Sequence, residues 1–438
     1  VVLAAALTGT VGHAQSAATR QLIERNVEFE QDIIRVSESV YTAVGYAVSP
    51  VSMIVGVDGV IIVDTGISPE AGRRIREDFR KIAGKPIKAI IFTHGHPDHI
   101  GGASAFVEEG TQVWAQEGFG AEQRLQNRAG LQIQGRRGAM QAGFLLSPEQ
   151  RINNGVAKAF WPERATGVFS KSAANDALPF QFVSGDGMIL RAAGLEIELL
   201  PAGGETDDHL IVWLPSEKVA FAGDNFYKSW PNTSAIRGTP YRDVQDWILA
   251  LQKIIDREPN AVVGGHTGPV IGRDTVREVL TNYRDAIQFV FDKTIEGMNK
   301  GLGPDALVDY VKLPEKFAKL DYLQPYYSNV EWSVRGIFSG YLGWFDGNAT
   351  NLFPLSAPEE ASRVARLAGG SAALTRRAKK AFASKDYQWA AQLCDYLLAL
   401  DPDDKRAMLL KADAFDNLAD QLLTATGRNY YLTSAKFL

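Results

Sequence analysis

The chain has 438 residues, of which 45% are hydrophobic and 22% are charged, so it can bury a large core and divide into two or three domains. Its 46 basic and 51 acidic residues give a net charge of -5, which argues against binding to nucleic acid or another polyanion. The single cysteine, Cys394, excludes an internal disulfide framework and a cysteine-based metal site. Any bound metal therefore needs histidines and carboxylates, and three of the six histidines fall within six residues.

The N-terminal segment is apolar and has small residues before Gln15, a pattern typical of the end of a secretory signal peptide. We therefore expect a signal remnant at residues 1–14 and an exported protein, periplasmic or secreted. A short core helix or a frayed terminus is the alternative interpretation. No other apolar run reaches the roughly 18 to 20 residues that cross a bilayer, so no stable membrane insertion is expected.

The following segment alternates short strands with helices. Residues 51–63 hold two β-branched runs joined by an Asp-Gly pair, which predicts a β-hairpin. The spacing of apolar residues predicts a helix over 69–83 and a buried strand over 87–92. Further strands are predicted at 112–115, 195–201, 210–214, 218–222 and 261–264, and further helices at 101–109, 243–256 and 274–297. This order indicates one mixed α/β unit, which we place at residues 25–300.

After residue 300 the pattern becomes helical. Helices are predicted at 358–368, 372–384, 387–400 and 405–424. Residues 381–404 resemble one tetratricopeptide helix pair and the start of another. Because an incomplete stack leaves an apolar helix face to cover, we predict that residues 301–438 form an all-α domain used for packing or dimer formation.

The central motif is Thr-His-Gly-His-Pro-Asp-His at 93–99, which leaves a predicted strand and enters a helix. Imidazole nitrogens and carboxylate oxygens suit Zn(II), and manganese or iron also accepts carboxylate-rich sites. One ion cannot use all four side chains well. Such a loop can serve two metals, with His94 and His96 turned to one and Asp98 and His99 to the other. The alternative, a loop that is rich in histidine by chance, is disfavoured by the low histidine content.

Two-metal sites need more ligands, including a carboxylate that bridges ions about 3.5 to 4 Å apart. Three later loops offer candidates, each after an apolar strand and a glycine: Glu205, Asp224 and His266. This position favours an exposed loop at a strand end over a buried core position. Taken singly, Asp224 and His266 also fit ordinary loop residues, and Glu205 has acidic and histidine competitors at 207–209.

The order of these motifs resembles the metallo-β-lactamase superfamily, and more narrowly its alkylsulfatase branch. Glu205 stands where most of the superfamily has His, and residues 236–243 (Ile-Arg-Gly-Thr-Pro-Tyr-Arg-Asp) resemble the branch's Arg-Gly-x-x-x-Arg-Asp. Residues 326–348 and 427–435 resemble the start and end of its helical dimerisation domain. The resemblance covers nearly all of the chain after residue 30. It implies an αββα sandwich with a dinuclear metal site, followed by a helical domain that forms a homodimer.

The resemblance also implies a ligand set for two zinc ions per subunit. It assigns His94, His96 and Glu205 to one ion, Asp98, His99 and His266 to the other, and Asp224 to a bridging position with a water. The bridging water would become a hydroxide that attacks the ester, which makes Asp98 and Asp224 catalytic. His209 is a further catalytic candidate as a proton donor, and a packing histidine is its alternative.

The implied substrate is a small alkyl sulfate ester, cleaved to alcohol and inorganic sulfate. Planar guanidinium groups bind anionic oxygens well, so Arg237 and Arg242 are the predicted sulfate anchors, with help from the Asn232 amide. A structural salt bridge is the alternative for these arginines. The sequence departs from the branch at Asp224, Pro231 and Thr267, where the branch usually has Glu, His and His.

Two other functions stay open at this point. The same centre also suits hydrolysis of a lactam, a lactone or another ester, because one fold hosts many chemistries. A metal-binding or helical scaffold without turnover is the second alternative. Nucleotide hydrolysis and serine esterase chemistry have no support, because neither a phosphate-cradling Gly-Lys-Ser/Thr loop nor a Gly-x-Ser-x-Gly elbow follows a suitable strand.

Overall fold

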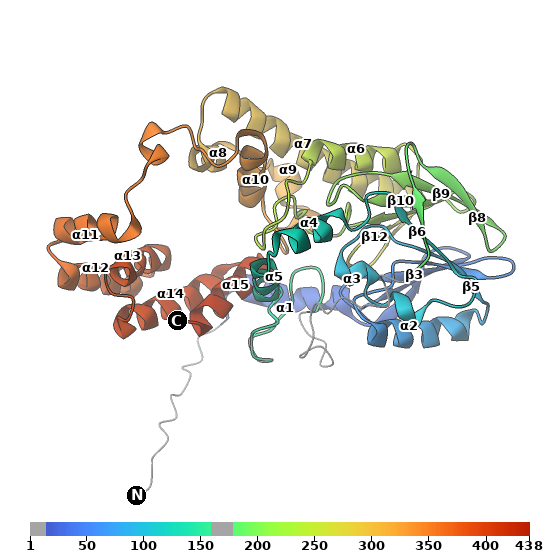
Figure 1. Ribbon diagram of the computed structural model, residues 1–438, viewed down its shortest axis with the longest axis horizontal. Helices are drawn as coiled ribbons and strands as arrows, with labels where there is room; N and C mark the ends of the chain where they lie inside the picture. The colour runs from blue at the N-terminus through green and yellow to red at the C-terminus, as the bar shows by residue number, and fades with distance from the viewer. Residues whose placement is uncertain (1–14, 159–177) are drawn as a thin grey trace, which may run out of the picture.

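The computed structural model describes residues 15–158 and 178–438. Two β-sheets lie face to face, helices cover their outer faces, and an all-helical region follows, so the predicted fold class is confirmed (Figure 1). The predicted signal remnant at residues 1–14 lies outside the described residues, and export stays a prediction. Among the described helices, none is long and apolar enough to cross a membrane.

The first sheet contains the predicted hairpin and the strand that leads to the central motif. Its described strands run in the order β1 (Asp32–Arg35), β2 (Val40–Val44), β3 (Val51–Val55), β4 (Val60–Val63), β5 (Ile87–Ile91), β6 (Gln112–Gln116) and β7 (Phe180–Val183). β3 and β4 are antiparallel, and β4 to β7 are parallel. The carboxyl ends of these parallel strands therefore meet at one edge of the sheet.

The second sheet brings the later loops to the same region. Its described strands run in the order β13 (Val270–Ile271), β12 (Ala261–Gly264), β11 (Val219–Gly223), β10 (Leu210–Leu214), β9 (Leu195–Pro201) and β8 (Met188–Ala192). β11 and β12 are parallel, so the loops after both strands leave from one edge.

Three apolar layers hold this sandwich together. Side chains from both sheets, such as Ile61 and Val212, form the layer between them. On the outer face of the first sheet lies α2 (Pro69–Ile82), which buries Ile75 and Phe79. The second sheet is covered by α6 (Val244–Ile255) and α7 (Arg273–Asn299). Every strand predicted from the sequence thus buries apolar side chains in one of these layers.

The predicted helix over 101–109 is wrong. The chain there forms α3 (Pro97–Ile100) and a single 3-10 turn, η2 (Ala103–Ala105). The two intervening glycines pack directly on the loop after β4: a Cβ on Gly101 would lie 2.1 Å from the Ile67 carbonyl oxygen, and one on Gly102 would lie 2.0 Å from that of Thr65. This close backbone approach fixes the central motif against the neighbouring strand end instead of extending the helix.

The helices after α7 pack into several apolar clusters. Leu307 of α8 (Pro304–Tyr310) and Val334 of α10 (Val330–Leu342) pack into the core of α6 and α7. A separate cluster, with Leu374 and Cys394 fully buried, begins at α11. The other α-helices described after α7 are α9 (Glu315–Ala318), α11 (Ala357–Ala368), α12 (Ser371–Ala383), α13 (Tyr387–Leu400), α14 (Lys405–Gln421) and α15 (Ala425–Lys436).

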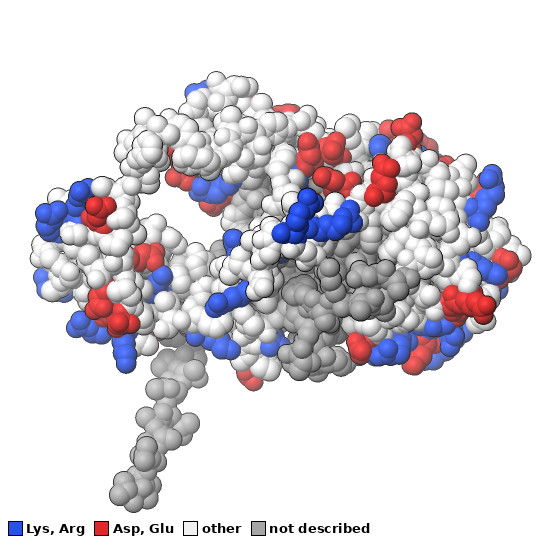
Figure 2. Space-filling model, viewed as in Figure 1, with Lys and Arg blue, Asp and Glu red and all other residues white. Residues whose placement is uncertain are grey.

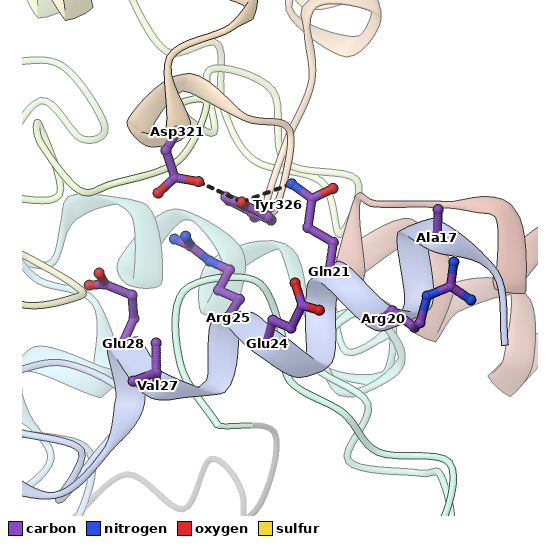
Figure 3. Close-up of a pocket in the computed structure, with 9 residues that line it drawn as sticks. All are labelled: Ala17, Arg20, Gln21, Glu24, Arg25, Val27, Glu28, Asp321 and Tyr326. Atoms are coloured by element: carbon purple, nitrogen blue, oxygen red, sulfur yellow. Dashed lines mark hydrogen bonds between the residues drawn. The ribbon is translucent and has the colours of Figure 1, made fainter.

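A short N-terminal helix, α1 (Ala17–Glu24), joins the helical region to the sandwich. The Thr19 hydroxyl donates to the Asp420 carboxylate at 2.6 Å, and the Gln21 amide donates to the Tyr326 hydroxyl at 3.1 Å. The Arg25 guanidinium, just after α1, lies 3.8 Å from the centre of the Tyr326 ring. A surface cavity of about 510 Å³ lies beside these contacts and contains none of the predicted site residues (Figure 3).

Candidate metal centre

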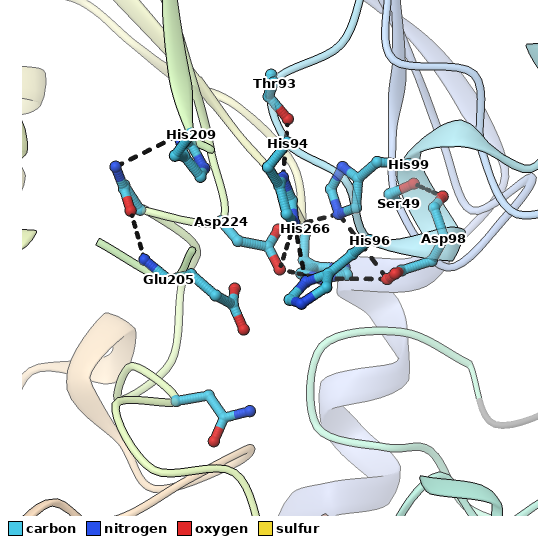
Figure 4. A network of polar contacts seen from close by, with 12 residues as sticks. Ser49, Thr93, His94, His96, Asp98, His99, Glu205, His209, Asp224 and His266 are labelled. Atoms are coloured by element: carbon cyan, nitrogen blue, oxygen red, sulfur yellow. Dashed lines mark hydrogen bonds and ion pairs between the residues drawn. The ribbon is translucent and has the colours of Figure 1, made fainter. Parts of the chain in front are cut away.

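The strand ends of the two sheets bring all seven predicted ligands together (Figure 4). The central loop follows β5, Asp224 follows β11, His266 follows β12, and Glu205 lies between β9 and β10. Six of the ligands are at most 5% exposed, and the seventh, Asp98, has a side chain that is 23% exposed. The expectation that Glu205, Asp224 and His266 lie in exposed loops is therefore wrong, because the facing loops of the two sheets cover one another.

The ligands form the two groups that the resemblance implies. Ligand atoms of His94, His96, Glu205 and Asp224 lie within 4.8 Å of one another, and those of Asp98, His99 and His266 form a second such group.

Asp224 lies between the two groups. Its Oδ1 atom is 3.1 Å from His99 Nε2, and its Oδ2 atom is 3.2 Å from His266 Nε2 and 3.8 Å from His94 Nε2. One carboxylate thus reaches histidines of both groups, which is the geometry of a bridging ligand.

Unsatisfied polar atoms show that a cation fits this place. Among the described residues, Glu205 Oε2 is buried without a hydrogen-bond partner, and His99 Nε2 and Asp224 Oδ1 face each other at 3.1 Å without a well-directed hydrogen bond. Buried polar atoms normally have one, so these lone pairs call for another ligand. Nitrogen and carboxylate oxygen donors suit a divalent metal such as zinc.

The two buried carboxylates lead to the same conclusion. Burial and the neighbouring Asp224 charge raise the pKa of Glu205 well above its usual value, although Arg242 opposes this. Burial also acts to raise the pKa of Asp224, but the charges of His266 and His99 outweigh it and hold that pKa well below its usual value. Two carboxylates this close carry charge together most easily when a cation neutralises them.

Asp64, directly after β4, orients two of the ligand histidines and was not predicted from the sequence. It accepts from His99 Nδ1 at 2.8 Å and from the Thr93 hydroxyl at 2.8 Å. That hydroxyl in turn lies 3.1 Å from His94 Nδ1, from which it can accept. Both histidines therefore keep Nε2 free to bind metal. Asp64 has φ +56°, a strained conformation that is typical of functional positions.

The signal for Asp64 was present in the sequence, because an Asp-Thr-Gly run follows the strand next to the central motif. His266 is held in a similar way: its Nδ1 donates to the Val48 carbonyl oxygen at 2.9 Å, which leaves Nε2 free. This contact is to a backbone carbonyl in a loop that is distant in the sequence, so no pattern of residue types predicts it.

The structure argues against a proton-donor role for His209. Its ring stacks on His94, with 4.9 Å between centroids and 16° between planes, and it is fully buried. Burial lowers its pKa to about 3, so the ring is neutral near pH 7. A Cβ on Gly223 would lie 2.6 Å from His209 Nε2, so this nitrogen faces the backbone of β11. The packing alternative explains His209 better than the catalytic one.

The predicted sulfate anchors also lie beside the ligands, in different surroundings. Arg237 is half-buried, with Nη2 3.4 Å from His96 Nε2. Arg242 is 3% exposed and makes a buried salt bridge to Glu205, and it donates to the Asn232 carbonyl oxygen at 2.5 Å. The salt-bridge alternative is therefore realised for Arg242, with a metal ligand as the partner. Its Nε and Nη2 atoms still have no hydrogen-bond partner among the described residues.

Comparisons with known proteins match both parts of the chain. The metallo-beta-lactamase superfamily model covers residues 45–266, and the alkyl sulfatase dimerisation model covers residues 304–438. A linear primary-alkylsulfatase from Pseudomonas sp. is 37% identical over 87% of this chain and 72% of its own length. This chain belongs to the alkylsulfatase branch of the metallo-β-lactamase superfamily.

Two further alkylsulfatases are similar over most of the chain. An (R)-specific secondary-alkylsulfatase from Pseudomonas sp. is 30% identical, over 92% of this chain and 62% of that protein. The structure of a stereoselective inverting sec-alkylsulfatase from Pseudomonas sp. matches with a TM-score of 0.87 at 27% identity, over 97% of this chain and 68% of that one. The family predicted from the motifs is therefore confirmed.

We expect Asp64→Asn to weaken metal binding by about 10- to 100-fold, because it removes the charge that orients His99 while keeping a residue that tolerates positive φ. Competition with a chelator for divalent metal measures the effect. Asp58→Asn, the same chemical change at an exposed hairpin turn, is the control and should bind as wild type. Equal affinities for Asp64→Asn and wild type would contradict the orienting role.

Proposed function

We propose that this chain is a metal-dependent sulfuric ester hydrolase that cleaves alkyl sulfate esters to an alcohol and inorganic sulfate. The observation that carries the proposal is the pair of ligand groups sharing Asp224, with guanidinium donors directly beside them. Membership of the alkylsulfatase branch supports the choice of a sulfate ester over other esters.

We further propose that each ligand group holds one zinc ion. Histidine nitrogens and carboxylate oxygens in both groups support zinc, and the position of Asp224 between them supports a count of two. When bound, such ions acidify water and stabilise the anionic oxygens that develop during hydrolysis.

Two arginines of the chain have separate roles beside the metal ligands. Arg237 is accessible enough to place its planar guanidinium against sulfate oxygens. Arg242 is 3% exposed and keeps the Glu205 carboxylate in place through their buried salt bridge. Burial of the ligands excludes bulk water, which strengthens these electrostatic contacts.

Metal analysis tests the ligand assignment. We expect about two zinc ions per chain after gentle purification, and about one in His266→Ala, because that variant removes one ligand nitrogen from the second group only. Asp207→Ala, an exposed carboxylate two residues from Glu205, is the matched control and should keep the wild-type content. Less than about one zinc per chain in wild type would instead favour a scaffold without turnover.

Sulfate release tests the substrate class. Wild type should release inorganic sulfate from a medium-chain alkyl sulfate, and Arg237→Ala should lower kcat/KM by about 10- to 100-fold, since a hydrogen bond to a charged group contributes about 1.5 to 3 kcal/mol. Arg136→Ala, which removes an exposed arginine from α5 (Ile133–Gln141), should change little. Turnover of a lactam or lactone without sulfate release, and without any effect of Arg237→Ala, would favour the alternative hydrolase.

We also propose that the protein is a homodimer. The dimerisation family model over residues 304–438 supports this, as does the apolar segment that links α10 and α11, where Trp344 is 77% and Phe353 is 93% exposed (Figure 1). A second copy of the chain would remove these rings from water.

Light scattering should give twice the mass of one chain, and the double variant Trp344→Ser, Phe353→Ser should shift the protein towards the monomer. Val57→Ser, which removes an equally exposed apolar side chain from the β3–β4 turn, is the control and should stay dimeric. A monomeric wild type at micromolar concentration would contradict the proposed homodimer.

A further inference from the structure

An acidic residue of the surface helix α4 (Ala121–Ala129) faces the metal ligands and has no role in the function proposed so far. Glu122 Oε2 lies 3.5 Å from His96 Nε2, and the Glu122 side chain is 13% exposed. The outer face of the same helix is basic and solvated: Arg124 and Arg128 are exposed, and Figure 2 shows Lys and Arg side chains gathered over α4. Glu122 is thus turned inward on a helix whose other charges point outward.

His96 differs from the other ligand histidines in its orientation. Its Nδ1 atom, not Nε2, faces the first ligand group, where it lies 3.0 Å from His94 Nε2. Because a neutral imidazole carries one proton, Nδ1 can bind a metal only when that proton sits on Nε2. The group that faces Nε2 therefore decides whether His96 is a ligand.

Two side chains compete for His96 Nε2, and they select opposite tautomers. Arg237 Nη2, at 3.4 Å, is only a donor and needs a bare Nε2. The proton would then sit on Nδ1 and point at His94 Nε2, so both nitrogens would be blocked for metal. The Glu122 carboxylate is only an acceptor and needs a protonated Nε2, which leaves Nδ1 free.

We propose that Glu122 is a positioning residue of the metal centre: it accepts the Nε2 proton of His96 and so commits Nδ1 to the metal. The inference rests on the proposed metal-dependent function. It also concerns Arg237, because a protonated Nε2 offers that guanidinium no acceptor. The Arg237 donors are then left for an anionic substrate oxygen.

Several contacts hold Glu122 in this position. The Gln126 amide, one turn further along α4, donates to Glu122 Oε1 at 2.8 Å, which leaves Oε2 for His96. The N-cap residue of the helix is Gly120, whose N–H donates to the Asp208 carboxylate at 2.8 Å. A Cβ on Gly95 would lie 3.0 Å from that same N–H nitrogen and 2.6 Å from Asp208 Oδ2. The start of α4 and the metal-binding loop are therefore packed directly together.

The test compares Glu122→Ala and Glu122→Gln with wild type in the full chain. Zn²⁺ affinity is measured by chelator competition, and the geometry of the site by the absorption spectrum of the Co²⁺-loaded protein. We expect Glu122→Ala to lower the affinity of one site by about 10- to 100-fold and to change the cobalt spectrum. Glu122→Gln should lose less, because its amide oxygen can still accept the Nε2 proton.

Glu108→Gln is the matched control. Glu108 is a half-buried carboxylate that pairs with Arg76 on the outer side of the first sheet, remote from the ligands. Its loss should lower the unfolding midpoint without changing the Zn²⁺ affinity or the cobalt spectrum. This separates a general loss of stability from a specific effect on His96.

Wild-type affinity and an unchanged cobalt spectrum in Glu122→Ala would overturn the inference, as would an equal loss of affinity in Glu108→Gln. Both readouts are independent of catalysis. If wild type binds zinc but releases no sulfate, the proposed substrate is wrong, and a weaker site in Glu122→Ala still supports the role of Glu122. If wild type binds no metal, the inference and the proposed function both fail.

Discussion

The interaction on which the rest of this structure depends is that of the buried Asp224 carboxylate with histidines on both sides. It reaches His99, His266 and His94 from the end of β11, in a place that is almost closed to water. Charged groups are costly to bury unless they are compensated, so this arrangement is stable only with opposite charge at its centre. The protein concentrates lone pairs here and leaves some of them without partners, which is what a cation site requires.

A centre of this kind needs a rigid frame, and the frame is built from many elements. Asp64 from the end of β4, the Val48 carbonyl from a loop before β3, and Glu122 from α4 each face the far nitrogen of a ligand histidine. The glycines after the central motif bring its backbone within contact of the β4 loop. His99, His266 and His96 consequently face partners from three different parts of the fold.

The two arginines beside the proposed substrate site also differ in their surroundings. Arg242 is committed to Glu205 through a buried salt bridge, whereas Arg237 stays partly open to solvent. Two arginines of one short motif therefore serve different needs, one holding a ligand in place and the other available to an anion. The fully buried His209 ring stacks on the ring of His94.

The sequence by itself determined the fold class and the family, and it named the side chains that form the two candidate ligand groups. Strand residues with β-branched side chains, followed by glycine and a metal-binding residue, indicate strand ends at one edge of a sheet, and the structure places Glu205, Asp224 and His266 accordingly. Such signals are local, because they depend on residue types at fixed spacings. The helix expected over 101–109 failed for the opposite reason: contacts with a distant loop shorten it.

Only the tertiary structure decided which nitrogen of each histidine faces the metal, which arginine is sealed, and that His209 lies behind the ligands. These properties depend on pairs that are remote in sequence, such as Glu122 with His96 and Arg242 with Glu205. A hydrogen bond depends on the distance and direction between two atoms, and residue spacing along the chain does not specify either across a folded core. The residue types thus indicate the chemistry of the site, whereas the positions of its protons and ion pairs depend on the tertiary contacts.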